Sequence, residues 1–330
     1  VIRDAIFGRV WYGVELERRN DATSEGSISL WKVTGKEVAI KEMNIAMIDK
    51  RIKVDNTENP YQEISAMQRM KREYLSSRAN MRGPLSRESL RDRVRDAVRT
   101  TNVMMPLDVL KDDNHIFCVM PYCDGCEMFS LLVDRRNSRA FSENKARGLF
   151  KQILDGIKSL QKAGICHLDI RLENLMITKD GRVIIIDFGG SIQIPYVGRK
   201  RCLIKPFRSP RGKHYYMSNE IVLRDRPFDG HAVDVWSLGP ILHMLVFGRQ
   251  PWELAHEMDV HFKCFSGGHF REYTTQWDHG LSPDLIDLLH HMFLLNPEDR
   301  LSLEQIQNHP WVRFHQPPSI NHMSPKQTEN

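Results

Sequence analysis

Residues 167–174 read His-Leu-Asp-Ile-Arg-Leu-Glu-Asn, and the triplet Asp187-Phe188-Gly189 follows soon after them. Far upstream, the run Val38-Ala39-Ile40 leads into Lys41. Each string alone is weak evidence, because an isolated Asp-Phe-Gly commonly forms a turn and a lysine at a strand end is usually solvated. Their order and spacing along one chain argue against chance, so the rest of the sequence is best interpreted outward from them.

The stretch between Asn174 and Asp187 predicts a tight hairpin. Two apolar runs, 175–178 and 182–186, flank Lys179-Asp180-Gly181. An Asp-Gly pair at this spacing is typical of a short turn between strands. Because the outer ends of a hairpin lie side by side, we expect the side chains of Asn174 and Asp187 to be close in space.

These segments resemble the catalytic loop, the metal-binding triplet and the phosphate-anchoring lysine of the eukaryotic protein kinase family, in the family's chain order. The resemblance continues downstream. Residues 217–220 are similar to the end of the activation segment, 234–239 to the central helix of the large lobe, and 309–311 to the last helices. Glu220 and Arg300 match the family's buried ion pair.

The resemblance covers residues 3–314 and implies an α+β fold with two lobes. A chain of 330 residues, 41% hydrophobic and 27% charged, is large enough to bury such a core. We expect a small β-rich N-lobe at 1–122, a larger, mainly helical C-lobe at 123–315 and a disordered tail at 316–330. Insertions are expected near 18–29 and 71–99.

Local signals predict several helices from Ser142 onward. Ser142 is placed to cap the helix that delivers the chain to the catalytic loop. Ser282 followed by Pro283 is typical of a helix start. Ser302 and Gln305 have the spacing of a capping box.

The resemblance implies that the chain uses ATP and Mg²⁺, and it assigns roles to the residues of the catalytic loop. Asp169 is the base that accepts the proton of the substrate hydroxyl, and Arg171 is a cation near the γ-phosphate. Asn174 and Asp187 offer oxygen atoms, which are the ligands that Mg²⁺ prefers.

The nucleotide site is expected in the N-lobe and at the junction of the lobes. Lys41 would contact the α and β phosphates, and Glu63 would hold Lys41 extended. The segment from Met120 to Cys123 resembles the hinge that binds adenine through the carbonyl of Pro121 and the amide of Cys123. The full set of nucleotide-binding residues is Gly8, Val10, Ala39, Lys41, Met120, Pro121, Cys123 and Met176.

The glycine-rich loop departs most from the family pattern. G-x-G-x-x-G-x-V aligns with residues 3–10, where Arg3 and Ala5 replace the first two glycines and only Gly8 remains. Glycines let the backbone approach phosphates closely. We therefore expect a raised Michaelis constant for ATP rather than a loss of chemistry.

Three further departures concern control and geometry. Leu168 replaces the arginine that clamps a phosphorylated activation loop; the same leucine occurs in kinases resembling the myosin light chain group, itself similar to calcium/calmodulin-dependent kinases. Lys213 replaces the threonine that braces Asp169, which leaves open whether its ammonium takes over that contact. Pro240 falls inside the expected central helix and should bend it.

Two basic segments have two interpretations each. Residues 71–99 hold nine Lys or Arg and four acidic residues, and residues 199–213 hold seven Lys or Arg and no acid. The first segment is expected to be a solvated helical insertion, or else a docking surface for an acidic partner. The second is a solvated, mobile loop, or else a surface for an acidic or phosphorylated substrate or for Ser209 once it is phosphorylated. Glu127 and Glu173 instead favour a basic substrate, because they match positions that bind a substrate arginine in basophilic kinases.

Composition narrows the other possibilities. The six cysteines are irregularly placed, which predicts reduced thiols, and the Cys123–Cys126 pair lacks a second pair for a metal site. A net charge of +5 without a basic stripe containing aromatic residues argues against nucleic-acid binding. The absence of a long apolar run argues against membrane insertion, so we expect a soluble cytoplasmic protein, with the nucleus as an alternative.

The resulting prediction is a protein Ser/Thr kinase that transfers the γ-phosphoryl group of Mg-ATP to a protein hydroxyl. Glu173 and the ending His309-Pro310-Trp311 favour Ser/Thr specificity, whereas Arg171 is also seen in some tyrosine kinases. A tyrosine or dual-specificity kinase is therefore one alternative. A pseudokinase scaffold that signals by binding is the other, suggested by the altered glycine-rich loop, Lys213 and the long basic insertion.

Overall fold

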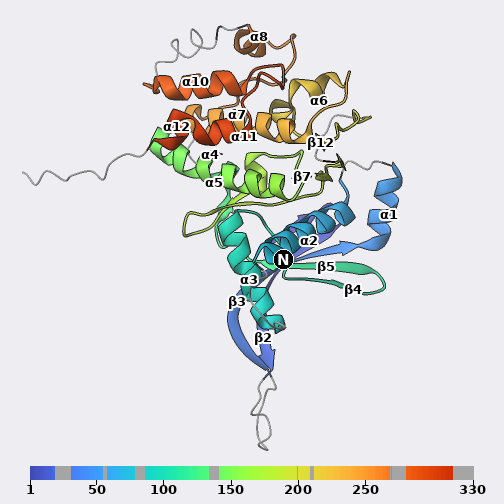
Figure 1. Cartoon of the computed structure of the whole chain (residues 1–330). Coiled ribbons are helices and arrows are strands. Elements are labelled where there is room, and N and C mark those ends of the chain that lie inside the picture. Colours follow the sequence, from blue (N-terminus) through green and yellow to red (C-terminus); the bar gives the residue numbers. More distant parts are fainter. Residues whose placement is uncertain are drawn as a thin grey trace, which may run out of the picture.

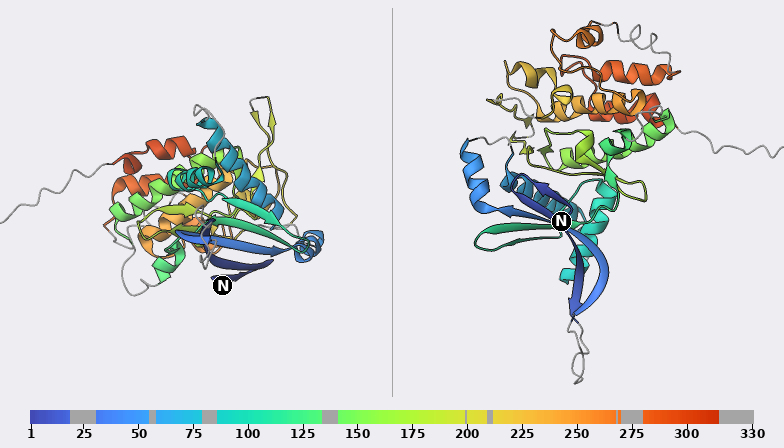
Figure 2. Two further views of the ribbon diagram at one scale, coloured as in Figure 1. Left: turned by 90° about the horizontal axis from the view of Figure 1, so that it is seen from below. Right: turned by 180° about the vertical axis from the view of Figure 1, so that it is seen from behind.

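The computed structural model describes residues 1–18, 31–54, 58–78, 86–133, 141–198, 200–208, 212–267, 269 and 280–314. In this part of the chain a β-sheet-rich N-terminal region is followed by a helical C-terminal region (Figure 1). The view from behind in Figure 2 shows the same division. This is the two-lobed α+β architecture expected from the sequence. The predicted excursion at 18–29 and the tail at 316–330 lie almost entirely outside the described residues.

The N-terminal region is built on an antiparallel sheet with the strand order β1-β2-β3-β5-β4. The strands are β1 (Arg3–Ala5), β2 (Gly8–Arg18), β3 (Trp31–Asn44), β4 (Asp108–Lys111) and β5 (His115–Pro121). Branched residues such as Val38 and Ile116 are buried, as expected for strands that cover a core. The register places Val10 opposite Lys41 and Ala39 opposite Met120.

Helices α1 (Ile45–Val54) and α2 (Pro60–Ser77) connect β3 to the rest of this region. The side chain of Asn59 caps α2 by accepting from the N–H groups of Tyr61 and Gln62, and Pro60 occupies the first turn, where it needs no hydrogen bond. The buried face of α2 carries Glu63 together with apolar residues. This face directs Glu63 toward β3.

Helix α3 (Arg87–Thr101) forms the C-terminal part of the predicted insertion at 71–99. The expectation that this helix is solvated is wrong, because Val94, Ala97 and Val98 are buried in the core. Arg91 pairs with Glu15 of β2 and with Asp108 of β4. The basic residues of α3 therefore attach the helix to the sheet as well as facing solvent.

The C-terminal region consists of helices with short strand pairs between them. Its elements are β6 (Cys126–Glu127), α4 (Met128–Val133), α5 (Glu143–Lys162), β7 (Ile165–Cys166), η1 (Leu172–Asn174), β8 (Leu175–Ile177), β9 (Val183–Ile185), β10 (Ile192–Gln193), β11 (Tyr196–Val197), β12 (Lys200–Arg201), η2 (His214–Tyr216), α6 (Asn219–Leu223), α7 (Gly230–Phe247), α8 (Val260–Ser266), α10 (Pro283–Met292), α11 (Leu303–Asn308) and α12 (Pro310–Arg313). Helix α7 is buried along its whole length and packs against α5 and α10. Pro240 lies inside it, and the helix continues through that residue.

The predicted helix starts are confirmed. Ser142 accepts from the N–H of Lys145 at the start of α5, and Ser282 accepts from the N–H of Leu285 at the start of α10. Ser302 and Gln305 form the capping box of α11. Local sequence signals are reliable at these positions because each cap is satisfied within one helical turn.

The predicted buried ion pair is also present. Arg300 contacts both carboxylate oxygens of Glu220, at 2.9 and 3.1 Å, with the two side chains 1% and 2% exposed. The guanidinium also lies 4.6 Å from the ring centroid of Trp236 in α7. This pair joins α6, the central helix and the segment before α11.

Candidate active site

The hairpin of β8 and β9 brings Asn174 next to the segment that carries Asp187. Gly181 has a φ of 81° in the turn, which suits glycine, and the Thr178 N–H donates to the Arg182 carbonyl at 2.9 Å. At the open end, the Ile186 N–H donates to the Asn174 carbonyl at 3.0 Å. The predicted hairpin is therefore confirmed, and it sets both candidate metal ligands at the same end.

Asp169 is held by two neighbours from its own loop. The amide nitrogen of Asn174 donates to the backbone carbonyl and to Oδ2 of Asp169, both at 2.9 Å. Arg171 Nε lies 3.0 Å from the same Oδ2. Burial raises the pKa of Asp169 to about 6, although the Arg171 charge opposes this shift. The carboxylate is thus fixed in place while its basicity is increased.

Asp234 of α7 fixes the backbone of the loop that carries Asp169. Its carboxylate accepts from the N–H groups of His167 and Leu168, both at 2.7 Å. Leu168 has a φ of 62°, which is rare for a leucine and needs such support. Sequence reasoning treated Asp234 only as part of a helix motif. A lone acidic residue in an otherwise apolar helix was the available signal.

The Asp187 segment is fixed by His167. The ring of His167 lies 4.9 Å from the ring of the fully buried Phe188, and its Nε2 lies 3.1 Å from the Ile186 carbonyl. Burial lowers the pKa of His167 to about 4, so its ring is neutral at pH 7. Asp187 has a φ of 65°. Its carboxylate is close enough to Lys41 for the two charges to influence each other.

Lys41 of β3 and Glu63 of α2 form the predicted ion pair. Lys41 Nζ lies 2.7 Å from both carboxylate oxygens, with the side chains 18% and 6% exposed. Burial alone would lower the pKa of Lys41, but the Glu63 and Asp187 charges outweigh it and the pKa is raised. The lysine is therefore a permanent cation between the sheet and the Asp187 segment.

The residues predicted to bind nucleotide come from four strands. Val10 lies on β2, Ala39 on β3 and Met120 on β5, and strand pairing aligns them. Met176 lies on β8 in the C-terminal region and pairs with Glu127. Cys123 follows β5, and burial raises the pKa of its thiol to about 12. Pro121, which ends β5, completes the hinge segment.

Gly8 has a structural role independent of any phosphate. A Cβ at this position would overlap the Glu42 carbonyl oxygen of β3, so the close pairing of β2 and β3 requires glycine here. Arg3, at the position of the first family glycine, lies on β1 and its guanidinium contacts Glu127 at 2.8 Å. The altered loop is thus a regular hairpin.

The structure answers the question about Lys213. Its ammonium lies 2.6 Å from Oε1 of Glu173 and close to the rings of Phe129 and Tyr215. The described residues contain no bond from it to Asp169. The neighbour Gly212 is the residue beside the base, because a Cβ there would lie 3.3 Å from Asp169 Oδ1.

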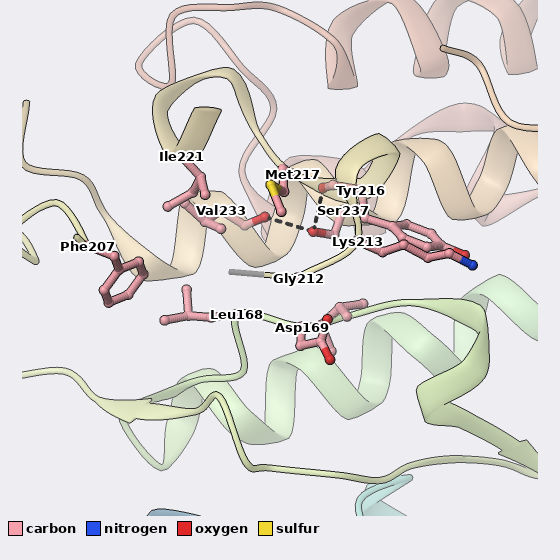
Figure 3. A pocket seen from close by; sticks show the side chains of 11 residues that line it. Leu168, Asp169, Phe207, Gly212, Lys213, Tyr216, Met217, Ile221, Val233 and Ser237 are labelled. Carbon is pink, nitrogen blue, oxygen red and sulfur yellow. Dashed lines mark hydrogen bonds between the residues drawn. The ribbon is translucent and has the colours of Figure 1, made fainter. Parts of the chain in front are cut away.

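A small cavity ends at Asp169 (Figure 3). Its walls include Leu168, Gly212, Lys213 and Met217, and its free volume of about 10 Å³ has room for about one water molecule. Ser237, which also lines the cavity, donates from Oγ to the Tyr216 carbonyl at 3.1 Å. The cavity places Asp169 and Lys213 on a common surface.

The donor atoms near the hairpin suit a hard divalent cation. Because the Asn174 amide nitrogen donates to Asp169, its amide oxygen remains for a metal, and the Asp187 carboxylate offers further oxygen atoms. Among the described residues no three His, Cys, Asp or Glu side chains cluster in a metal-binding arrangement. Mg²⁺ at this position would complete its shell with phosphate oxygens and water.

The cations of the two basic segments differ in their surroundings. In the first segment Lys71 donates to the carbonyls of Pro106 and Leu107, and Arg95 pairs with Glu15. In the described part of the second, Arg201 pairs with Asp229. Its exposed cations without an acidic partner among the described residues are Lys200, Lys205 and Arg208. Among the described residues, the second segment has the larger share of basic side chains without an acidic partner.

Comparison with known proteins agrees with this geometry. Residues 92–312 match the family described as the protein kinase domain. Sperm motility kinase 2B of Mus musculus is 32% identical over 214 residues, which cover 64% of this chain and 40% of that protein. The probable serine/threonine-protein kinase HSL1 of Saccharomyces cerevisiae is 31% identical over 223 residues, covering 67% of this chain and 14% of that protein. The abscisic acid-inducible protein kinase of Triticum aestivum is 30% identical over 219 residues, covering 65% of this chain and 62% of that protein.

The chain therefore belongs to the protein kinase family, whose members generally use ATP and Mg²⁺. It spans about two fifths of the length of the sperm motility kinases that it matches. The matched range begins inside α3, so Lys41, Glu63 and the β1–β2 hairpin lie outside it. None of the described helices has the length and apolar character needed to cross a membrane.

Proposed function

We propose that this chain is a protein Ser/Thr kinase that transfers the γ-phosphoryl group of Mg-ATP to a protein hydroxyl. The proposal is carried by the Asp169 carboxylate, which Asn174 and Arg171 hold beside the Asp187 segment. The Lys41–Glu63 pair from the other lobe supports it. Relatives named as serine/threonine kinases support the Ser/Thr type.

Each residue contributes a distinct part of the reaction. Asp169 accepts the proton of the substrate hydroxyl and positions its oxygen for attack. Lys41 holds the α and β phosphates, and Arg171 adds a cation near the phosphate being transferred. Asn174 and Asp187 would hold Mg²⁺, which neutralises phosphate charge when it is bound. Val10, Ala39, Met120 and Met176 would form apolar contacts to adenine, with hydrogen bonds from the hinge at Pro121 and Cys123.

The domain limits and the setting of the protein form part of the same proposal. We place the N-lobe at 1–122 and the C-lobe at 123–315, with the hinge between them. The substrates are proteins of the cytoplasm or nucleus. Of the two basic segments, 199–213 is the better candidate for contact with an acidic partner, because its exposed cations Lys200, Lys205 and Arg208 have no acidic partner among the described residues.

The test is transfer of labelled γ-phosphate with Mg²⁺, comparing the native chain with Asp169→Asn. Removing the base should lower the rate by about 100-fold or more, because general base catalysis typically contributes that much. Mg-ATP binding by both chains, measured by calorimetry, is the control for folding. Equal incorporation by both chains would contradict the proposal.

Two alternatives have specific support and separate tests. Arg3 and Ala5 in place of glycines suit a pseudokinase, which would show no phosphate transfer even in the presence of saturating Mg-ATP. Arg171 is compatible with a tyrosine or dual-specificity kinase, and phosphotyrosine among the products of a mixed substrate pool would identify one. Phosphoserine and phosphothreonine alone support the proposal.

A further inference from the structure

Lys213 and Glu173 form an ion pair beside the proposed base. Lys213 Nζ lies 2.6 Å from Glu173 Oε1, and the side chains are 40% and 17% exposed. The second carboxylate oxygen of Glu173 is buried and accepts no hydrogen bond from the described residues. The ammonium is also placed by the rings of Phe129 and Tyr215, at 5.0 and 5.1 Å from their centroids. Lys213 is thus the only group that the described residues provide to neutralise Glu173 directly.

The pair lies where a substrate must approach. Lys213 and Asp169 line the same cavity in Figure 3, and Gly212, the chain neighbour of Lys213, lies beside Asp169. Glu173 is part of η1, four residues after Asp169, and its charge acts on Arg171, which contacts Asp169. A peptide that presents its hydroxyl to Asp169 therefore meets the exposed side of Lys213 with the residues next to that hydroxyl.

Removing the ammonium would invert the local charge. Without Lys213, Glu173 would be a largely buried carboxylate with no cation in direct contact among the described residues, and such a group gains strongly from a new charge-assisted hydrogen bond. A substrate arginine or lysine could supply that bond. With Lys213 present, its partly exposed ammonium, together with the exposed cations Lys205 and Arg208 of the same segment, instead repels basic residues and attracts acidic ones.

We propose that Lys213 is a specificity-determining residue: it occupies the Glu173 carboxylate and directs the enzyme toward hydroxyls flanked by acidic residues and away from hydroxyls flanked by basic residues. The inference rests on the proposed function, because Asp169 is the base that defines where the peptide binds.

The experiment compares two serine peptides of equal length, one with aspartates and one with arginines flanking the serine. The ratio of kcat/KM for the acidic peptide to that for the basic peptide is measured for four chains: native, Lys213→Met, Glu173→Gln and the double variant. Methionine retains the apolar stem over Phe129 and Tyr215 and removes only the charge. We expect Lys213→Met to lower the ratio about tenfold, mostly through the KM of the basic peptide. The double variant should lose the gain for the basic peptide, because no carboxylate is left to bind it.

Lys205→Met is the matched control, since it removes one exposed cation of the same segment without uncovering a carboxylate. An equal change of the ratio in Lys205→Met and Lys213→Met would overturn the proposal in favour of a general charge effect. A gain for the basic peptide that persists in the double variant would overturn it as well. Thermal unfolding of each variant identifies any chain that does not fold. Glu173→Gln provides a second test: while Lys213 is present, this variant should change the ratio of kcat/KM for the two peptides only slightly.

Failure of the proposed function would look different. If the native chain transfers no phosphate to either peptide, the preference is read from the Kd of fluorescent peptides in which alanine replaces serine. Tighter binding of the basic peptide to Lys213→Met, by about tenfold, supports the inference even then. An unchanged Kd overturns it.

Discussion

At the scale of single residues, the candidate site depends on groups that hold the loop as well as on those that act in it. Asp234 is 1% exposed and accepts two backbone hydrogen bonds from His167 and Leu168. These bonds compensate for the positive φ of Leu168. The position of Asp169 therefore depends on a carboxylate that belongs to another helix.

Replacing Asp234 with alanine should reduce both stability and activity. Two buried backbone N–H groups would lose their acceptor, which should lower the free energy of unfolding by about 2–4 kcal/mol. Urea denaturation measures the first effect and phosphate transfer the second. Asp225→Ala, at an exposed position, is the control and should be neutral. A variant with native stability and rate would show that Asp234 does not hold the loop.

His231 predicts a pH dependence of stability. Its Nδ1 accepts from Arg201 at 2.9 Å, and burial, followed by the Arg201 charge, lowers its pKa from 6.5 to about 4. A folded-state pKa below the unfolded value stabilises the protein above pH 6.5, and this stabilisation is lost as the pH falls toward 4. The loss should reach roughly 3 kcal/mol. His231→Gln should show a flatter decline in urea midpoint over this range, whereas parallel curves would exclude His231 as the cause.

At the scale of elements, strand pairing explains a glycine that the sequence associated with phosphate. Gly8→Ala should destabilise the protein by about 2–3 kcal/mol, because the new methyl group meets the Glu42 backbone rather than a flexible side chain. Gly148→Ala on the exposed face of α5 is the control and should be neutral or stabilising by up to about 1 kcal/mol. Urea unfolding tests both variants. Equal stability of Gly8→Ala and the native chain would contradict the assigned role.

The sequence predicted turns and helix caps correctly where all the residues that form them lie within a few positions of one another. The Asp180-Gly181 turn and the caps at Ser142 and Ser302 are examples, because their hydrogen bonds are local. For α3 the sequence predicted the helix but not its burial. Its spacing indicated a helix, but its burial depends on contacts with Glu15 and Asp108, which lie on distant strands.

At the scale of the whole molecule, the Glu220–Arg300 pair joins segments that are far apart in the chain. Glu220→Gln would leave a buried guanidinium without its counter-charge, which should cost about 3–5 kcal/mol. Urea denaturation measures the cost, with the exposed Glu304→Gln as the control. Replacing Glu220 and Arg300 together with methionine should recover part of the loss, since neither charge is then left unpaired. A cost below about 1 kcal/mol for the single variant would contradict a fully buried pair.

The sequence by itself determined the family, the two-lobed architecture and the identity of the candidate catalytic residues. It could do so because Asp169 and Asn174 lie in one short loop, and one hairpin sets Asn174 next to the Asp187 segment. Only the tertiary structure decided the partners of the long charged side chains: Lys213 contacts Glu173 rather than Asp169, and Arg3 contacts Glu127. The reason is physical. Hydrogen bonds within a turn are fixed by residue spacing, whereas a flexible lysine or arginine can reach several carboxylates, and the packing of distant elements determines which one it meets.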